Sequence, residues 1–236
     1  FKVGVAIVDV SAGLFAVIGI LAALHQRQAT GQGQFIDIAL FDAQLGWLVN
    51  VASNYLVSGQ PPRRYGNAHG TIVPYQTFAS ADGHLMLAVG NDGQFGALCR
   101  VLGQAELADD PRFATNPARV TNRDVLVPLL QKEFSSRTTR QWIEALLDAH
   151  VPCSPVNDIP TALGSPQAQA RGMVQQVIDG TGDLISLVGP VIKMGDAPPD
   201  VRTAPPLLGE QTAEILREKL GYDGAQIEAL GKRGVI

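Results

Sequence analysis

The longest uncharged apolar stretch of the sequence runs from Val10 to Leu24 (VSAGLFAVIGILAAL), and it limits what the chain can fold into. A helix needs about 20 apolar residues to cross a bilayer, and this stretch falls short of that length. Extending it back to Val3 would supply the length but would place Asp9 in the hydrocarbon region, where a carboxylate is costly. We therefore predict a buried core helix of a layered, soluble fold with no membrane partner.

The elements around this stretch alternate between helix and strand. Helical spacing continues from Asp9 to about Ala29, and the glycines of Thr30–Gly33 are typical of a helix C-terminus. The alternating run Phe35–Leu40 predicts a strand, and Phe41–Val57 predicts a second helix. The order helix, strand, helix predicts an α/β fold with strands of the parallel-sheet type.

The middle of the chain has the pattern of a separate α+β domain. The turn Asp82-Gly83 joins two apolar segments, which predicts a β-hairpin, and Thr138 or Thr139 is a candidate N-cap for a later helix. The elements expected here are strands 75–79 and 85–89 and helices 94–102, 121–134 and 139–149.

The last part of the chain is rich in proline. Val151–Val156 contains two prolines, which argues against a central strand and favours a segment that crosses back between domains. The prolines of Gln60–Pro62 and Asp196–Pro206 are typical of linkers. The remaining expected elements are strands 174–178 and 184–188 and short helices 212–220 and 225–230.

Composition excludes several classes of protein. The chain has 236 residues, 46% of them apolar, and a net charge of -4, which is incompatible with intrinsic disorder. Its 18 basic residues are outnumbered by 22 acidic ones, so a nucleic-acid partner is not expected. Two cysteines and four scattered histidines supply neither a disulfide framework nor a zinc site. We expect a reduced, cytoplasmic protein and, because the sequence opens at Phe1 within a pattern, a fragment of a longer one.

Asp9 is the first candidate for chemistry, because it separates an apolar run from a helix that opens with small residues. It could be an N-cap that accepts hydrogen bonds from the first-turn amides. The same position would also expose an ionised carboxylate to a substrate, where it could attack an activated acyl group. The residues alone leave both interpretations open.

The second candidate is the loop Tyr65–Thr71, which is rich in Gly, Asn and His. Glycine allows a backbone in which N–H groups point together at a carboxylate or an oxyanion. His69 could act as a base, donate a hydrogen bond or serve the loop structurally. A flexible connection between domains is the alternative for the whole segment.

Two stretches carry the pattern of a known family. The first, VDVSAGLFAVIGILAALHQRQATGQGQFIDIALFDAQLGWL, has an Asp before a long apolar helix, the motif R-x-x-T-G-x-G-Q from Arg27, an apolar strand and a D-A helix start at Asp42. The second is GNAHGTIVPYQTFASADGHLMLAVGNDGQF, from Gly66 to Phe95, and shorter matches follow at VPCSPV and APPLLGE. With these motifs in this order along the sequence, the chain resembles the class III CoA-transferase family. That family includes formyl-CoA transferase, carnitine CoA-transferase and α-methylacyl-CoA racemase.

The resemblance implies a fold and an assembly. It implies part of a Rossmann-like large domain, a smaller α+β domain and an interlocked homodimer. The large domain would comprise residues 1–60, the substrate loop and linker 61–72, the small domain 73–150, and the return crossing with the C-terminal part of the large domain 151–236. The match covers only the later part of such an enzyme, so most CoA contacts would lie in a region that precedes this sequence.

The resemblance also implies a mechanism. It places the catalytic aspartate at Asp9 and the substrate loop at His69, Gly70 and Thr71. Asp9 would form an acyl anhydride from an acyl-CoA and then an aspartyl-CoA thioester, with a small dicarboxylate such as succinate as one substrate. No metal is implied, and no cofactor other than the CoA thioester that serves as substrate. His69 replaces a glycine of the formyl-CoA transferase loop, which argues against oxalate as substrate.

Two alternatives to a CoA-transferase remain. An α-methylacyl-CoA racemase would use the aspartate as acid or base together with a histidine. Similar racemases usually continue with Phe-Gly-Gly-Gly, whereas Val10-Ser11-Ala12-Gly13 follows Asp9 here, which favours the transferase. The other alternative is a non-catalytic fragment that lacks the CoA-binding half.

Overall fold

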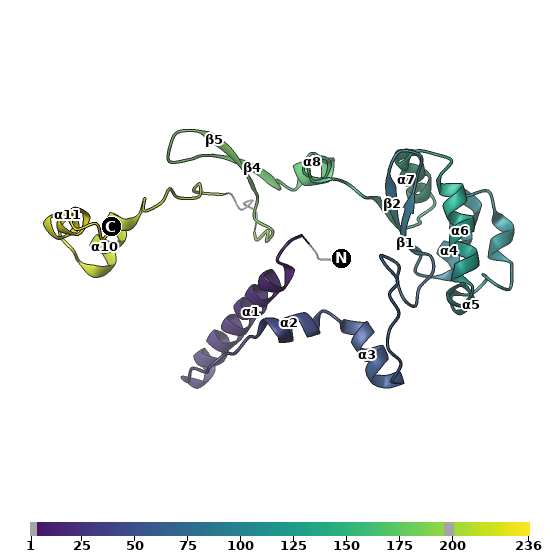
Figure 1. The fold of residues 1–236 in the computed structure, drawn as a ribbon, viewed down its shortest axis with the longest axis horizontal. Coiled ribbons are helices and arrows are strands. Elements are labelled where there is room, and N and C mark those ends of the chain that lie inside the picture. The colour runs from purple at the N-terminus through teal and green to yellow at the C-terminus, as the bar shows by residue number, and fades with distance from the viewer. Residues whose placement is uncertain (1–3, 196–200) are drawn as a thin grey trace.

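The computed structural model describes residues 4–195 and 201–236, so the predicted linker prolines Pro198 and Pro199 lie outside the described residues (Figure 1). The helices are α1 (Ile7–Thr30), α2 (Leu40–Gly46), α3 (Val49–Ser58), α4 (Asp92–Val101), the 3₁₀ helix η1 (Ala105–Ala108), α5 (Asn116–Thr121), α6 (Arg123–Phe134), α7 (Thr139–Asp148), α8 (Ile159–Leu163), α9 (Pro166–Ala170), α10 (Thr212–Leu220) and α11 (Gly224–Lys232). The strands are β1 (Tyr75–Ala79), β2 (His84–Ala88), β3 (Cys153–Pro155), β4 (Val174–Ile178) and β5 (Leu184–Val188).

A sheet of three strands, β1-β2-β3, organises the middle of the chain. β2 lies in the centre and pairs antiparallel with both neighbours, with Tyr75 opposite Ala88 and Leu87 opposite Cys153. The hairpin therefore forms within one residue of its predicted bounds. The short β3 is an edge strand, where a proline such as Pro155 is tolerated because one side of an edge strand needs no ladder hydrogen bonds.

The helices α4, α6 and α7 pack with this sheet around one hydrophobic core, which we call the compact body (Figure 1). In α6, Leu126, Leu130 and Phe134 recur every four residues and are fully buried on one face. Trp142 of α7 packs edge-on against Phe134 at 5.2 Å between ring centroids. The buried core residues are Val73, Phe78, Leu85, Leu87, Val89, Phe95, Leu98, Cys99, Leu102, Phe113, Leu126, Leu130, Phe134, Trp142, Leu146 and Val151.

Local signals in the sequence fix the start of α7. Thr138 is its N-cap, as predicted, and forms a capping box with Gln141. Asp82 in the hairpin turn accepts a hydrogen bond of 2.7 Å from the N–H of Thr139. The turn and the helix are thus joined at the N-terminus of α7.

α1 is a regular helix that ends in Gly31, whose φ of 72° is in the left-handed region. The prediction that it is a buried core helix is wrong for this chain, because Ser11 is its only buried residue. Leu14, Ile18 and Leu21, at helical spacing on one face, are each about 60% exposed. α2 is the element that packs against α1, and it is too short to cover it. By length and composition α1 could also cross a membrane, a property that signal sequences and soluble core helices share.

The predicted strand Phe35–Leu40 does not form, because no described strand lies beside it to complete a ladder of hydrogen bonds. Ile36 instead packs against Gly19 of α1. The predicted helix Phe41–Val57 is divided into α2 and α3 by a break at Trp47 and Leu48. At this break the indole N–H of Trp47 donates to the hydroxyl of Ser11 at 2.8 Å.

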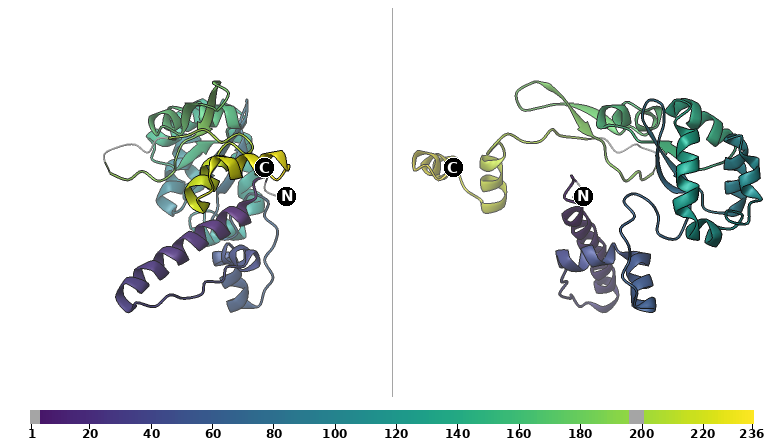
Figure 2. Two further views of the ribbon diagram at one scale, coloured as in Figure 1. Left: turned by 90° about the vertical axis from the view of Figure 1, so that its left-hand side faces the viewer. Right: turned by 45° about the vertical axis from the view of Figure 1, so that its right-hand side comes forward.

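The C-terminal elements lie away from the compact body in both views that show the length of the molecule (Figures 1 and 2). β4 and β5 form an antiparallel hairpin with the predicted bounds. α10 also has its predicted bounds, and α11 extends slightly beyond its own. The short helices α5, α8 and α9 were not predicted.

Candidate functional site

Asp9 lies in the first turn of α1, and its side chain is exposed. The N-cap of this helix is Ala6, which makes no side-chain cap, so the interpretation of Asp9 as an N-cap is wrong. Its carboxylate makes no hydrogen bond or ion pair with any residue that the structure describes. The result is a bare carboxylate that a ligand could approach.

A cavity of about 390 Å³ lies between α3 and the loop that precedes β1. The predicted substrate residues His69, Gly70 and Thr71 all line it, but Asp9 does not. The chain thus brings the three loop residues together and leaves Asp9 apart from them. The remaining lining residues are Asn50, Val51, Asn54, Tyr55, Gln60, Pro62, Arg63, Tyr65, Gly66 and Ala68.

His69 is fixed by its neighbours on both its ring and its backbone. The ring stacks on Tyr75 with 5.3 Å between centroids, and the N–H of His69 donates to the carbonyl of Tyr75 at 2.9 Å. Nδ1 accepts a hydrogen bond of 3.2 Å from the N–H of Thr71. In the neutral ring this assignment places the proton on Nε2, which leaves a donor for a ligand.

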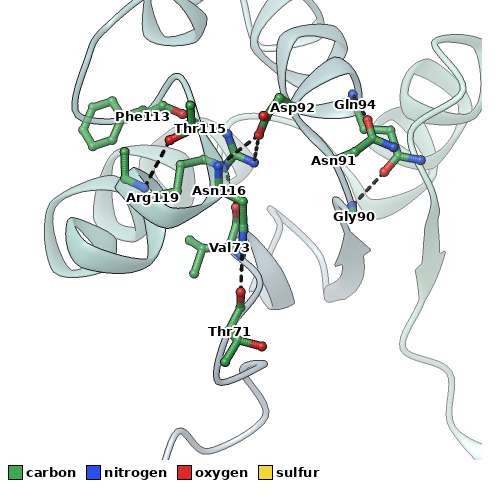
Figure 3. A network of polar contacts seen from close by, with 11 residues as sticks. Thr71, Val73, Gly90, Asn91, Asp92, Gln94, Phe113, Thr115, Asn116 and Arg119 are labelled. Atoms are coloured by element: carbon green, nitrogen blue, oxygen red, sulfur yellow. Dashed lines mark hydrogen bonds and ion pairs between the residues drawn. The ribbon is translucent and has the colours of Figure 1, made fainter. Parts of the chain in front are cut away.

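The end of the loop is attached to the compact body by Asn116 and Arg119 (Figure 3). The amide of Asn116 donates to the carbonyl of Thr71 at 2.9 Å and accepts from the N–H of Val73 at 3.1 Å. The fully buried Arg119 donates to the carbonyl of Val73 at 2.7 Å. Sequence reasoning missed both residues, since nothing in the pattern marks a buried arginine in advance.

Arg123, at the start of α6, binds the last part of the loop. Its guanidinium donates to the carbonyl of Gly70 at 2.6 Å and to that of His69 at 3.3 Å. The same group lies over the ring of Tyr65, 4.6 Å from the centroid. These contacts argue against the alternative of a flexible connection, because they hold the loop at both of its ends, Tyr65 and His69–Thr71.

The loop also leaves a donor unused. Gly70 lines the cavity, and its N–H has no hydrogen-bond partner among the described residues. The only formal charge on the described cavity wall is the exposed Arg63, which forms no ion pair with the residues around it. A cationic side chain and a free N–H suit an anionic ligand such as a carboxylate.

Comparison with known proteins identifies the family. The model of the family described as CoA-transferase family III matches residues 1–212. The chain belongs to this family. Proteins similar to it include succinyl-CoA:glutarate CoA-transferase of Mus musculus, 40% identical over 99% of this chain, and succinate–glutarate CoA-transferase of Agrobacterium fabrum, 42% identical over 92%. The chain spans about half the length of these relatives, 53% and 54% respectively.

Solved structures confirm the α/β fold class. A CaiB/BaiF family protein from Brucella suis is 43% identical and superposes with a TM-score of 0.74, covering 92% of this chain and 56% of that one. The protein Rv3272 of Mycobacterium tuberculosis, 22% identical with a TM-score of 0.75, shares the fold. The resemblance to class III CoA-transferases that the sequence motifs indicated is therefore confirmed.

Proposed function

We propose that this chain carries the catalytic aspartate and the substrate loop of a CoA-transferase that moves CoA between carboxylic acids. The observation that carries the proposal is Asp9: an exposed carboxylate in the first turn of a long helix, without a partner among the described residues. Membership of CoA-transferase family III and the activities named for its relatives support the reaction class.

The proposed reaction begins with attack of an Asp9 carboxylate oxygen on the thioester carbon of an acyl-CoA. A C–O bond forms, the C–S bond breaks, and CoA leaves as the thiolate, which gives a mixed anhydride. The thiolate then attacks the Asp9 carbonyl of the anhydride and releases the donor acid, leaving an aspartyl-CoA thioester. An acceptor carboxylate reverses the two steps, so a new acyl-CoA forms and Asp9 returns as a carboxylate.

The loop would stabilise the negative charge that develops in each of these steps. The free N–H of Gly70 and Nε2–H of His69 are donors of the kind that bind a tetrahedral oxyanion. Asp9 does not line the same cavity. The proposal therefore requires a second chain to bring a catalytic aspartate close to the loop. An interlocked homodimer, in which one copy supplies the loop and another the aspartate, would provide it.

Small dicarboxylates are the substrates that we propose. Three similar relatives are named for the transfer of CoA between succinate and glutarate. In this chain Arg63 offers a cation on the cavity wall that could pair with a second carboxylate. We further propose that the protein is cytoplasmic and uses no metal or cofactor beyond its CoA substrate, because the thioester is already activated.

The test of Asp9 uses the full-length protein. Incubation with succinyl-CoA followed by hydroxylamine should convert Asp9 to its hydroxamate, and mass spectrometry of the peptide that contains it would identify the site. Asp9→Ala should lower transfer from succinyl-CoA to glutarate by at least about 10³-fold, because it removes the nucleophile.

Asp42→Ala is the matched control, since Asp42 also lies in the first turn of a helix, α2. It should retain transfer activity and yield no hydroxamate of its own. Transfer that survives Asp9→Ala would remove Asp9 as the nucleophile. Exchange of the α-proton of a 2-methylacyl-CoA for deuterium without transfer would favour the racemase alternative.

A further inference from the structure

The loop Tyr65–Thr71 separates two hollows on the surface. The cavity of about 390 Å³ described above lies on one side, and a second hollow of about 360 Å³ lies on the other. Tyr65 and Ala68 line both, so the loop is a thin wall between them. Gly70 lines only the first cavity, and Arg123 lines only the second. The two residues therefore approach the wall from opposite faces.

The contacts of Arg123 determine which way the peptide groups of this wall face. Its guanidinium binds the carbonyl oxygens of His69 and Gly70 from the side of the second hollow. In a trans peptide the N–H points opposite to the carbonyl. Binding the carbonyl of His69 therefore turns the N–H of Gly70 away from Arg123, toward the first cavity, where it has no partner among the described residues.

The arginine is itself held in place. It lies over Tyr65 at 4.6 Å from the ring centroid, and it forms no ion pair with any carboxylate that the structure describes. A planar guanidinium can bind two carbonyls and stack on a ring at once, whereas an ammonium cannot reproduce this fork. The hydrogen bonds that Arg123 donates to described residues therefore all go to backbone carbonyls of the loop.

From these contacts we propose that Arg123 is a positioning residue for the proposed transferase site: it orients the His69–Gly70 peptide so that the N–H of Gly70 is presented to the carboxylate or oxyanion in the cavity. The proposal rests on the proposed function for what the N–H binds, but the orientation itself does not depend on it. Arg123 touches no reacting atom and acts only through the loop.

The main variant is Arg123→Met in the full-length protein, which keeps an unbranched apolar stem over Tyr65 but removes every donor. Loss of one oxyanion donor lowers kcat by about 100-fold or more, so we expect a fall of that size with the KM for succinyl-CoA within about 2-fold of wild type. The kcat of Arg123→Lys should lie between that of wild type and that of Arg123→Met. Arg140→Met, at an exposed arginine of α7, is the matched control and should leave kcat unchanged.

A second measurement reports on the conformation of the loop and does not depend on enzymatic activity. Hydrogen–deuterium exchange followed by mass spectrometry should show faster exchange in the peptide covering residues 65–72 of Arg123→Met, since the carbonyl contacts are lost. Peptides from β2 and α7 should exchange as in wild type, which separates a loosened loop from general unfolding. Methylguanidine added to Arg123→Ala should restore part of the lost kcat.

The outcomes distinguish this inference from the proposed function. Unchanged kcat in Arg123→Met, or a lowered kcat with wild-type exchange in residues 65–72, would overturn the positioning role. If Arg123→Met fails to fold, Arg123→Lys decides: wild-type kcat and loop exchange in that variant would overturn the role as well. Faster loop exchange in Arg123→Met together with transfer that survives Asp9→Ala would leave the loop contact standing and overturn the proposed function instead.

Discussion

Arg119 and Asp92 form an ion pair in which one partner is wholly buried and the other is not. The guanidinium donates to the carboxylate at 2.8 Å, and the side chain of Arg119 is 0% exposed while that of Asp92 is 55% exposed (Figure 3). Arg119 also donates to the carbonyls of Val73 and Phe113 and lies 4.4 Å from the ring centroid of Phe95. It therefore joins the segment that directly follows the loop Tyr65–Thr71 to the core of the compact body.

Arg119→Met should destabilise the protein by about 3 kcal/mol, because it leaves two buried carbonyl groups without donors. Chemical denaturation followed by circular dichroism would measure the free energy of unfolding. Arg112→Met is the matched control, since the Arg112–Asp110 pair is on the surface with Arg112 59% exposed. Its cost should stay below about 1 kcal/mol, and equal costs for the two variants would contradict this account.

The turn of the hairpin should give the protein part of its acid sensitivity. The N–H of Thr139, assisted by the hydroxyls of Thr139 and Ser80, holds the pKa of the Asp82 carboxyl below its usual range. A carboxyl whose folded pKa is lowered contributes stability above its unfolded pKa of about 4 and loses that contribution as pH falls toward the folded pKa.

Asp82→Asn should therefore be less stable than wild type at neutral pH, and this difference should shrink as pH falls below about 4. Thermal unfolding measured from pH 7 to pH 3 would show it. Asp109→Asn is the control, since the exposed carboxylate of Asp109 accepts no hydrogen bond from a described residue. A difference between wild type and Asp82→Asn that stays constant over this pH range would contradict the assignment.

The exposed apolar stripe on α1 should be covered in the assembled protein. Leu14, Ile18 and Leu21 lie on one face and are each about 60% exposed, and the proposed homodimer would bury such a surface. The double substitution Leu14→Glu, Ile18→Glu should convert the full-length protein from dimer to monomer, as measured by light scattering after size-exclusion chromatography. Leu147→Glu, at an exposed leucine of α7, should remain dimeric. A dimer that survives the double substitution would place its interface elsewhere.

Elements with local signals were predicted well from the sequence. The hairpin β1–β2 has a Gly-containing turn at Asp82-Gly83, and α7 has its capping box at Thr138, so neighbouring residues alone specify these elements. The strands β4 and β5 are also neighbours in sequence joined by a short turn, and they form with their predicted bounds. Their bounds could be read without knowing what packs against them.

Elements that depend on distant partners were predicted badly. Phe35–Leu40 has the alternation of a strand, but a strand requires a neighbour, and none lies beside it among the described residues. The prediction that α1 is buried was wrong for the same reason. The hydrophobic pattern indicates an apolar helix, but it does not show which element covers that helix. The division into domains at 60, 72 and 150 stays a prediction.

The candidate site shows the same contrast. Asp9 and the loop residues His69, Gly70 and Thr71 could be selected from the sequence because small residues and glycine flank them. The side chains that hold the loop, Asn116, Arg119 and Arg123, lie about 50 residues further on and act through backbone carbonyls. Carbonyl groups are present at every residue, so no sequence pattern marks the contact in advance.

The central position of β2 has a mechanical consequence. β1 and β3 both run antiparallel to β2, so the chain enters the sheet at Tyr75, opposite Ala88, and leaves it at Pro155, opposite Leu85. Entry and exit are therefore at opposite ends of one central strand, separated by three steps of its register, or roughly 10 Å along the strand direction. The compact body thus acts as a rigid spacer in the chain, and a load applied between the flanking segments would shear β1 and β3 against β2 instead of peeling them apart.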